Sequence, residues 1–175
     1  MRTIFLNGNE FEWNYIGKLK EEAKKYGITI GSNVSIDSNV SIGADVIISS
    51  DVSIGSNVII SSNVNIWSNV SIGSDIRIGS GVKIWSGTRI PVGIKGKVYK
   101  VQRLSGLYRY EQDIIYTDKD IYIKMGCLTF TVDKWKGNFW NNDNEFLNDG
   151  DEGSVDRLEA FNICMRILKL DEIKG

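Results

Sequence analysis

The amino-acid sequence predicts a mainly β protein built around a solenoid of short stacked strands. Isoleucine returns at every sixth position from residue 30 to residue 90, with no insertion. Four residues after most of these isoleucines stands a second aliphatic residue, usually preceded by Asn or Asp. A fixed repeat of this kind is the sequence signature of a solenoid. The repeated isoleucines are Ile30, Ile36, Ile42, Ile48, Ile54, Ile60, Ile66, Ile72, Ile78, Ile84 and Ile90.

Each six-residue repeat has the composition of a strand followed by a corner. An α-helix needs apolar residues at a mean spacing of 3.6, and a spacing of six does not keep that phase. Ile and Val are stiff side chains that favour a pleated strand. Asn, Asp and Gly tolerate the positive φ angles of tight corners. We therefore expect parallel strands that stack about 4.8 Å apart.

The run Ile-Gly-Ser-Asn-Val-Ser, which begins at Ile30 and recurs with small changes, resembles the hexapeptide-repeat superfamily. The resemblance implies a left-handed parallel β-helix, an exception to the usual right-handed crossover. In that family three hexads form one triangular coil, so residue i lies over residue i+18. Applied to this chain, the coils are residues 30–47, 48–65 and 66–83, and a fourth begins at 84–91.

The segment before the repeat is expected to close the open end of the solenoid. We expect a short strand at residues 3–6 and then a helix from Asn9 or Glu10 to Tyr26, which Gly27 ends as a C′ glycine. Such a helix would cover strand groups and apolar side chains that the first coil leaves open. Its expected apolar face contains Phe11, Tyr15, Leu19, Ala23 and Tyr26.

The segment after the repeat is expected to be a small α+β cap. Pro91 and Gly93 end the repeat, and Ser154 is placed to N-cap a last helix. The chain then divides into an N-terminal cap (1–29), the β-helix (30–93) and a C-terminal cap (94–175). The strands expected in the C-terminal cap are residues 97–101, 107–110, 114–116, 121–125 and 127–131, with a short helix at 133–139. The expected apolar stripe of the last helix is Val155, Leu158, Phe161, Met165 and Leu168.

Composition restricts the possible functions. The chain of 175 residues has a net charge of −1, two cysteines and no histidine. Cys127 and Cys164 form no disulfide framework and have no metal-ligand spacing, so we expect a cytoplasmic protein with no metal or cofactor. We expect no membrane partner, because no apolar run is long enough to span a bilayer. The balanced charge argues against a nucleic-acid partner.

Two tryptophans and two isoleucines on the outside of the coils are candidate contact residues. Trp67 and Trp85 are 18 residues apart and should stack on adjacent coils, while Ile47 and Ile59 interrupt an outward polar column. Exposed apolar patches usually mark interfaces. The resembled proteins are commonly trimers packed side by side, so these residues are the expected subunit contacts of a homotrimer. A ligand-stacking platform and packing under the C-terminal segment are the alternatives.

A cationic stretch follows the tryptophans. Eight Lys or Arg residues and no Asp or Glu lie between Arg77 and Tyr110. This local field suits a phosphate or carboxylate ligand. The alternative is a solvated surface balanced by the acidic stretch Asp143–Glu159. The candidate ligand-binding residues are Trp67, Trp85, Arg77, Lys83 and Arg89.

The resemblance implies a chemistry that this sequence does not support in its usual form. Most characterised members are acyltransferases that use acyl-CoA and a histidine base, and some are carbonic anhydrases that hold zinc with three histidines. Without histidine, no catalytic or metal-binding residue is carried over. Asp45, Asp51 and Asp75 occupy corner positions, where a turn role is expected.

The function expected from the sequence is therefore non-catalytic. A trimeric β-helix would bind an anionic small molecule, such as a nucleotide signal, or a protein partner. An acyl-CoA-dependent acyltransferase without the usual base and an architectural virion component are the alternatives. The run Trp-Lys-Gly-Asn-Phe-Trp-Asn-Asn at residues 135–142 resembles tails of uncharacterised phage hexapeptide proteins, for which a host protein is a possible partner.

Overall fold

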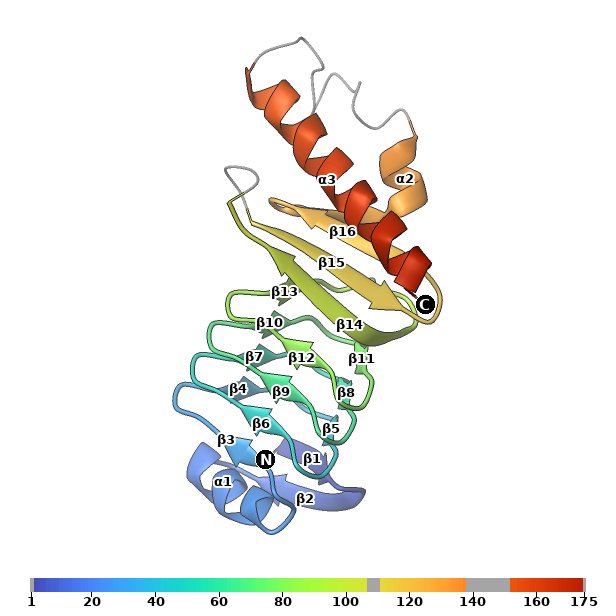
Figure 1. Cartoon of the computed structure of the whole chain (residues 1–175). Helices are drawn as coiled ribbons and strands as arrows, with labels where there is room; N and C mark the ends of the chain where they lie inside the picture. The colour runs from blue at the N-terminus through green and yellow to red at the C-terminus, as the bar shows by residue number, and fades with distance from the viewer. Residues whose placement is uncertain (1, 107–110, 138–151, 175) are drawn as a thin grey trace. The chain divides into compact units, whose positions relative to one another are not determined.

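The computed structural model describes residues 2–106, 111–137 and 152–174, and the chain forms two compact units. The first unit contains residues 1–102 and 115–120, and the second contains residues 103–114 and 121–175. The first unit holds the repeat. Figure 1 shows its short strands stacked in successive coils, with the N-terminal elements at the first coil.

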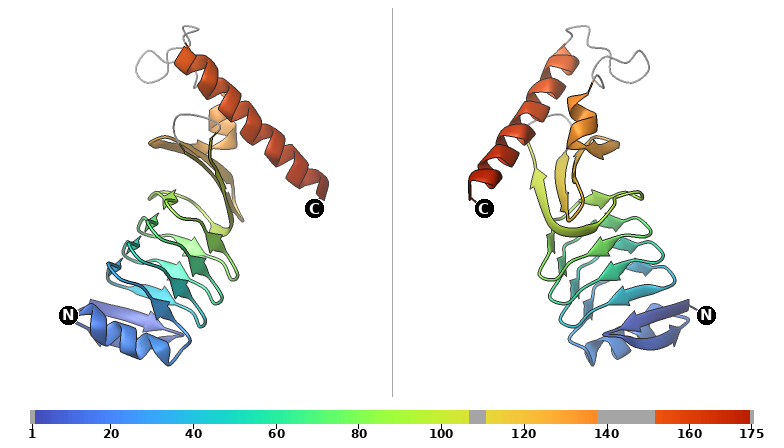
Figure 2. Two further views of the ribbon diagram at one scale, coloured as in Figure 1. Left: turned by 60° about the vertical axis from the view of Figure 1, so that its left-hand side comes forward. Right: turned by 90° about the vertical axis from the view of Figure 1, so that its right-hand side faces the viewer.

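Three parallel sheets form the sides of the solenoid, and the rungs of each sheet stack directly over one another (Figure 2). Within the repeat, residue i pairs with residue i+18, as Ile30 with Ile48 and Ile48 with Ile66, so the predicted coil size and β-helix class are confirmed. Sheet 1 contains β3 (Thr29–Ile30), β6 (Ile47–Ile48), β9 (Asn65–Ile66) and β12 (Lys83–Ile84). Sheet 2 contains β4 (Ser35–Ile36), β7 (Ser53–Ile54), β10 (Ser71–Ile72) and β13 (Arg89–Ile90). Sheet 3 includes β5 (Val40–Ile42), β8 (Ile59–Ile60) and β11 (Arg77–Ile78).

The interior of the solenoid is a uniform aliphatic column. All eleven repeated isoleucines are buried, and the most exposed of them, Ile30, has only 8% of its surface accessible. Backbone N–H groups donate to the next coil at residue i+17, as in Ser35 N to Val52 O at 2.9 Å. The burial of apolar side chains and the backbone hydrogen bonds between coils therefore repeat together at every coil.

The corners use left-handed backbone conformations. Eight Asn or Asp residues have φ between 53° and 63°, a region that these side chains tolerate better than most. Their side chains also link the coils, as in Asn33 Nδ2 to Asp51 Oδ1 at 3.0 Å. The expected turn role of Asp45, Asp51 and Asp75 is confirmed. The eight residues are Asn33, Asn39, Asp45, Asp51, Asn57, Asn63, Asn69 and Asp75.

The N-terminal cap differs from the predicted strand and long helix. β1 (Arg2–Leu6) pairs with β2 (Asn9–Trp13) in an antiparallel hairpin, and only α1 (Ile16–Lys24) is helical. The prediction of a helix from residue 9 was wrong because Asn7 and Gly8, with φ of 48° and 82°, form a two-residue hairpin turn. Of the expected apolar face, Leu19 and Ala23 are buried in α1, whereas Phe11 lies in β2.

The hairpin and α1 satisfy backbone groups at the first coil. β1 runs parallel to β5 as an additional rung of sheet 3, and Asn7 N donates to Ile42 O at 2.7 Å. Arg2 Nη1 donates to Ile36 O at 2.8 Å, on the first rung of sheet 2. Gly27, with φ of 72°, ends α1 as predicted, because Gly27 N and Ile28 N bond back to Lys24 O and Ala23 O.

The last coil is completed by a strand outside the repeat. β14 (Lys97–Leu104) pairs with β11, so that Lys97 lies beside Arg77 and Val98 beside Ile78. The offset is 20 residues instead of 18, since two additional residues precede this rung. The end of β15 (Gln112–Thr117) also belongs to the first unit, where Tyr116 Oη donates to Gln102 Oε1 at 3.2 Å.

The second unit packs around Trp135. β16 (Ile121–Met125) and β17 (Leu128–Thr131) form an antiparallel hairpin that continues into α2 (Val132–Lys136). Trp135 is fully buried and donates from Nε1 to Ile123 O at 2.8 Å, with Phe130 edge-on at 5.3 Å. Thr131 Oγ1 caps α2 by accepting from Lys134 N. The strand expected at 107–110 and the end of the helix expected at 133–139 lie outside the described residues.

The buried face of the last helix agrees with the predicted stripe at Phe161 and Leu168 but not at Val155 and Leu158. α3 (Glu152–Lys174) begins before Ser154, so Ser154 is not its N-cap. Val155 and Leu158 are 55% and 40% exposed, which contradicts their place in the expected stripe. The prediction counted only large apolar residues, whereas the observed face includes small ones. The buried positions of this face include Ala160, Phe161, Cys164 and Leu168.

Adjacent isoleucines on one strand provide a matched test of the solenoid core. Ile48 is fully buried, and Ile47 is 48% exposed. We expect Ile48→Ala to lower the free energy of unfolding by about 2–5 kcal/mol because it leaves a cavity. Ile47→Ala should cost less than about 1 kcal/mol. Urea denaturation of both variants measures the difference, and equal losses would contradict the described register.

A second test concerns the corners. Asn63 has φ of 62°, and Gly81 occupies the equivalent corner one coil later. We expect Asn63→Ala to destabilise the fold by about 1–2 kcal/mol, since a Cβ without a local hydrogen-bonding group is strained there. Asn63→Gly should stay within about 0.5 kcal/mol of the parent. Thermal unfolding that ranks Gly below Ala would show that this corner is not left-handed.

Candidate ligand-binding surface

Trp67 and Trp85 form a stacked pair on the outside of the solenoid. Their ring centroids are 4.3 Å apart and their planes differ by 7°. Trp67 directly follows β9 and Trp85 directly follows β12, so the 18-residue register of sheet 1 brings them together. Trp67 N also donates to Ile84 O at 2.9 Å. The pair is thus held by two rigid rungs, and Trp85 keeps 43% of its surface exposed.

The outward positions around the tryptophan pair carry no acidic side chain. Alternation along β12 buries Ile84 and exposes Lys83 and Trp85, which therefore share the outer surface of sheet 1. The outward column before the buried isoleucines of this sheet contains Thr29, Ile47, Asn65 and Lys83. The column after them contains Gly31, Ser49, Trp67 and Trp85. Aromatic and cationic residues thus replace small and polar ones toward the last coil.

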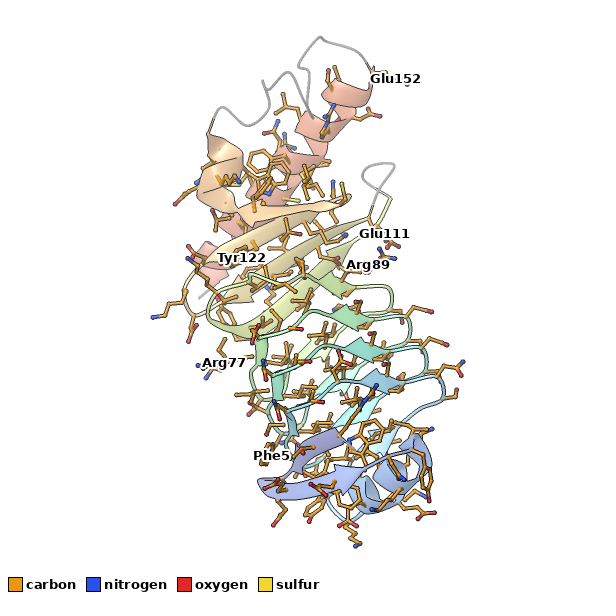
Figure 3. The ribbon with its side chains drawn as sticks, turned by 180° about the vertical axis from the view of Figure 1, so that it is seen from behind. Phe5, Arg77, Arg89, Glu111, Tyr122 and Glu152 are labelled. Atoms are coloured by element: carbon orange, nitrogen blue, oxygen red, sulfur yellow. The ribbon has the colours of Figure 1, made fainter. Side chains whose placement is uncertain are left out.

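The three cations predicted to share a surface lie on three different sheets. Arg77 is on sheet 3, Lys83 on sheet 1 and Arg89 on sheet 2. Figure 3 shows Arg77 on the same side of the solenoid as Phe5, with Arg89 on another side. Lys97 lies beside Arg77 on sheet 3. We call Arg77, Lys83, Arg89 and Lys97 the cationic collar, since they surround the last coils.

Sequence spacing explains why the collar was not anticipated as a ring. Arg77, Lys83 and Arg89 are six residues apart, and a step of six moves to the next side of the triangle. Lys97 was missed as the neighbour of Arg77 because the two-residue insertion after Ile90 breaks the repeat. The only signal in the sequence for the β14 rung was that the six-residue spacing of isoleucine ends after Ile90.

The predicted contact isoleucines are exposed but separate. Ile47, on sheet 1, is 48% exposed, and Ile59, on sheet 3, is 43% exposed. The tryptophan pair is therefore on the same sheet as Ile47 and on a different sheet from Ile59.

Other cations of the predicted basic stretch have partners. Arg103 forms ion pairs with Glu111 and with buried Asp113, the latter at 3.7 Å. Lys100 Nζ lies 4.6 Å from the centroid of the Tyr116 ring. Within the described ranges, no ion pair is found for the four collar side chains. The collar therefore contains the cations of this stretch that are available to an anion. Arg109 and the acidic residues 143–151 lie outside those ranges.

The described side chains offer no familiar catalytic cluster. No group of three Cys, Asp or Glu side chains is placed to hold a metal ion in the part of the chain that the structure describes. Cys127 is exposed in the turn between β16 and β17, and Cys164 is buried in α3. Burial raises the pKa of the Cys164 thiol to about 12 from its usual 9.0, so this thiol stays protonated and unreactive at neutral pH.

The two thiols should differ sharply in reactivity. We expect one fast reaction with a disulfide reagent at pH 8, lost in Cys127→Ser, and a second reaction only after denaturation. Because the folded-state pKa of Cys164 is raised, its thiol ionises more readily when unfolded, and the fold loses stability as pH rises from about 9 toward 12. Cys164→Ala should remove that part of the pH dependence. Two fast thiols in the native protein would contradict the described burial.

Comparisons with known proteins agree with this architecture. Residues 57–91 match the family model described as bacterial transferase hexapeptide (six repeats). No match was found among curated proteins or among solved structures. None of the described helices has the length and apolar character needed to cross a membrane. The matched residues and the stacked coils both fit the hexapeptide-repeat β-helix superfamily.

Proposed function

We propose that the protein is a non-catalytic homotrimer that binds an anionic small molecule in the grooves between its subunits. The observation that carries the proposal is the stacked Trp67–Trp85 pair, whose exposed face stands beside Lys83 in the cationic collar. A nucleotide has the matching chemistry, since its base can stack on an aromatic ring and its phosphates can meet cations.

The positions of the exposed apolar residues favour side-by-side association. Ile47 and the tryptophan pair belong to sheet 1, while Ile59 belongs to sheet 3, so two sides of the prism carry apolar side chains. In a cyclic trimer each subunit presents one surface to one neighbour and a different surface to the other. Two different apolar sides suit that arrangement, which is common among proteins with this repeat.

The collar favours an anion in the resulting groove. Every side of the prism has a cation near the last coil, so any two sides that meet would bring cations from two subunits together. Like charges brought close repel unless an anion lies between them. A bound phosphate or carboxylate would therefore stabilise both the groove and the trimer.

Acyl transfer is the second candidate function. The matched family is described as a transferase hexapeptide, which favours an acyl-CoA-dependent reaction. The chain contains no histidine, so another group would have to act as general base. Tight binding of acetyl-CoA with release of free CoA in the presence of amines or sugars would favour this activity. A protein partner or an architectural role would leave the groove without a small molecule.

Native mass spectrometry of the freshly purified protein tests the main proposal. We expect a species of three times the 19.6 kDa chain mass, plus a ligand that departs on denaturation. Lys83→Glu should lower retention of that ligand at least tenfold, a change of about 1.4 kcal/mol, because it reverses the collar charge beside the tryptophan pair on sheet 1. Lys24→Glu makes the same charge change on exposed α1 and should retain the ligand.

The outcomes separate the candidate functions. A trimer of bare chain mass that also binds no added nucleotide or acyl-CoA would favour a protein partner or an architectural role. A monomer at working concentration would remove the groove and overturn the proposal. Equal retention by Lys83→Glu and Lys24→Glu would place the ligand away from the tryptophan pair and the collar.

A further inference from the structure

The last coil of the solenoid carries the same side-chain pattern on two of its sides. On sheet 1 the pattern is the run Lys83–Trp85, and on sheet 3 it is the run Lys97–Tyr99. Each run has an exposed lysine, a buried aliphatic residue and an exposed aromatic residue. Trp85 is 43% exposed and Tyr99 is 53% exposed. Because alternate residues of a strand point to the same surface, each run presents a cation and an aromatic ring outward.

The earlier rungs of sheet 3 lack this aromatic residue. On the rungs below β14, the position of Tyr99 is taken by Gly43, Ser61 and Gly79. The coil at which the aromatic residue is introduced is the one that exposes Trp85 on sheet 1. The stacking of the coils does not require this change, since the same position accepts glycine or serine on three rungs.

Tyr99 and Lys97 are both fixed by neighbours within the first unit. The ring centroid of Tyr99 lies 6.1 Å from that of Tyr116 on β15, with the planes tilted by 49°. Tyr116 is buried and donates from Oη to Gln102 Oε1 at 3.2 Å. The backbone N of Lys97 donates to Asp118 Oδ1 at 2.7 Å. These contacts hold the start of β14 and the ring that follows it.

The two runs do not share a surface within one chain, since they lie on different sheets. The proposed trimer would place sheet 1 of one subunit against sheet 3 of the next. Rotation about an axis parallel to the solenoid keeps each coil at its own height, so the two runs of the last coil would meet. Facing strands then run in opposite directions. The lysine of each run is thereby set against the aromatic ring of the other.

We propose that the groove ligand is a planar aromatic anion of the nucleotide class, held by Trp85 and Lys83 of one subunit and Tyr99 and Lys97 of its neighbour. This inference rests on the homotrimer and the anion site proposed above. We call these four residues the aromatic clamp. The base stacks between the two rings, and the phosphates lie between the two lysines. The site is incomplete in any single chain.

Binding of ATP and of tripolyphosphate, measured by calorimetry, separates stacking from charge attraction. We expect the parent to bind ATP more tightly than tripolyphosphate, which has charge but no base. Tyr99→Leu should lower the affinity for ATP by about tenfold and the affinity for tripolyphosphate much less, because it removes only a stacking surface. Tyr99→Phe, which keeps the ring, should bind ATP more tightly than Tyr99→Leu. Tyr15→Leu, the same change on an exposed tyrosine of the N-terminal cap, should bind ATP like the parent.

A mixing experiment tests whether the two rings come from different subunits. Trimers of Trp85→Leu chains alone, or of Tyr99→Leu chains alone, contain no complete clamp. Refolded together from urea in equal amounts, the two variants should regain about a quarter of the ATP sites of the parent, since each interface has one chance in about four of joining two intact rings. Native mass spectrometry identifies the mixed trimers, because the two variants differ in mass.

The outcomes distinguish the clamp from the function on which it rests. A trimer that binds tripolyphosphate as tightly as ATP, or mixed trimers that regain no ATP sites, would overturn the clamp and leave the proposed anion site in place. A monomer, or a parent trimer that binds neither probe, would overturn both. Recovery of ATP sites only in mixed trimers would support the clamp, because no site within one chain can be restored by a neighbour.

Discussion

The stacking of each residue on its counterpart 18 positions away is the constraint on which this structure depends. One coil presents its buried isoleucines and its backbone groups to the next, and both must align at once. Ile48, for example, lies between Ile30 and Ile66 in the core, while the backbone beside it donates to the coil above. A single insertion would displace every later rung, which explains the unbroken repeat. The left-handed Asn and Asp corners allow the chain to turn within six residues.

This constraint leaves two places where the chain can vary, the outward positions and the ends. At the first coil, β1 adds a rung and Arg2 satisfies the carbonyl of Ile36. At the last coil, β14 pairs with β11 at an offset of 20 residues instead of 18 and still completes sheet 3. Each end therefore combines capping of the ladder with side chains that the core does not determine. The tryptophan pair and the collar belong to one end, and the β1–β2 hairpin and α1 belong to the other.

The regular core was predictable because one spacing determines it. The Trp67–Trp85 stack followed from the same spacing and was found as expected. The N-terminal hairpin was missed, although Asn7-Gly8 is a strong turn signal, since the apolar spacing from Phe11 to Ala23 also fits a helix. The buried face of α3 includes Ala160, which a count of large apolar residues overlooks. The contacts of Arg2 with Ile36 O and with the Trp13 ring join residues that only the tertiary fold brings together.

The spacing of the collar has a consequence for how an anion could be bound. Residues six apart occupy different sides of the triangular solenoid, so Arg77, Lys83 and Arg89 of one chain lie on three different sheets. In the proposed trimer, their charges would act together on one ligand only where the sides of two subunits meet. Binding at the collar should then depend on protein concentration through assembly.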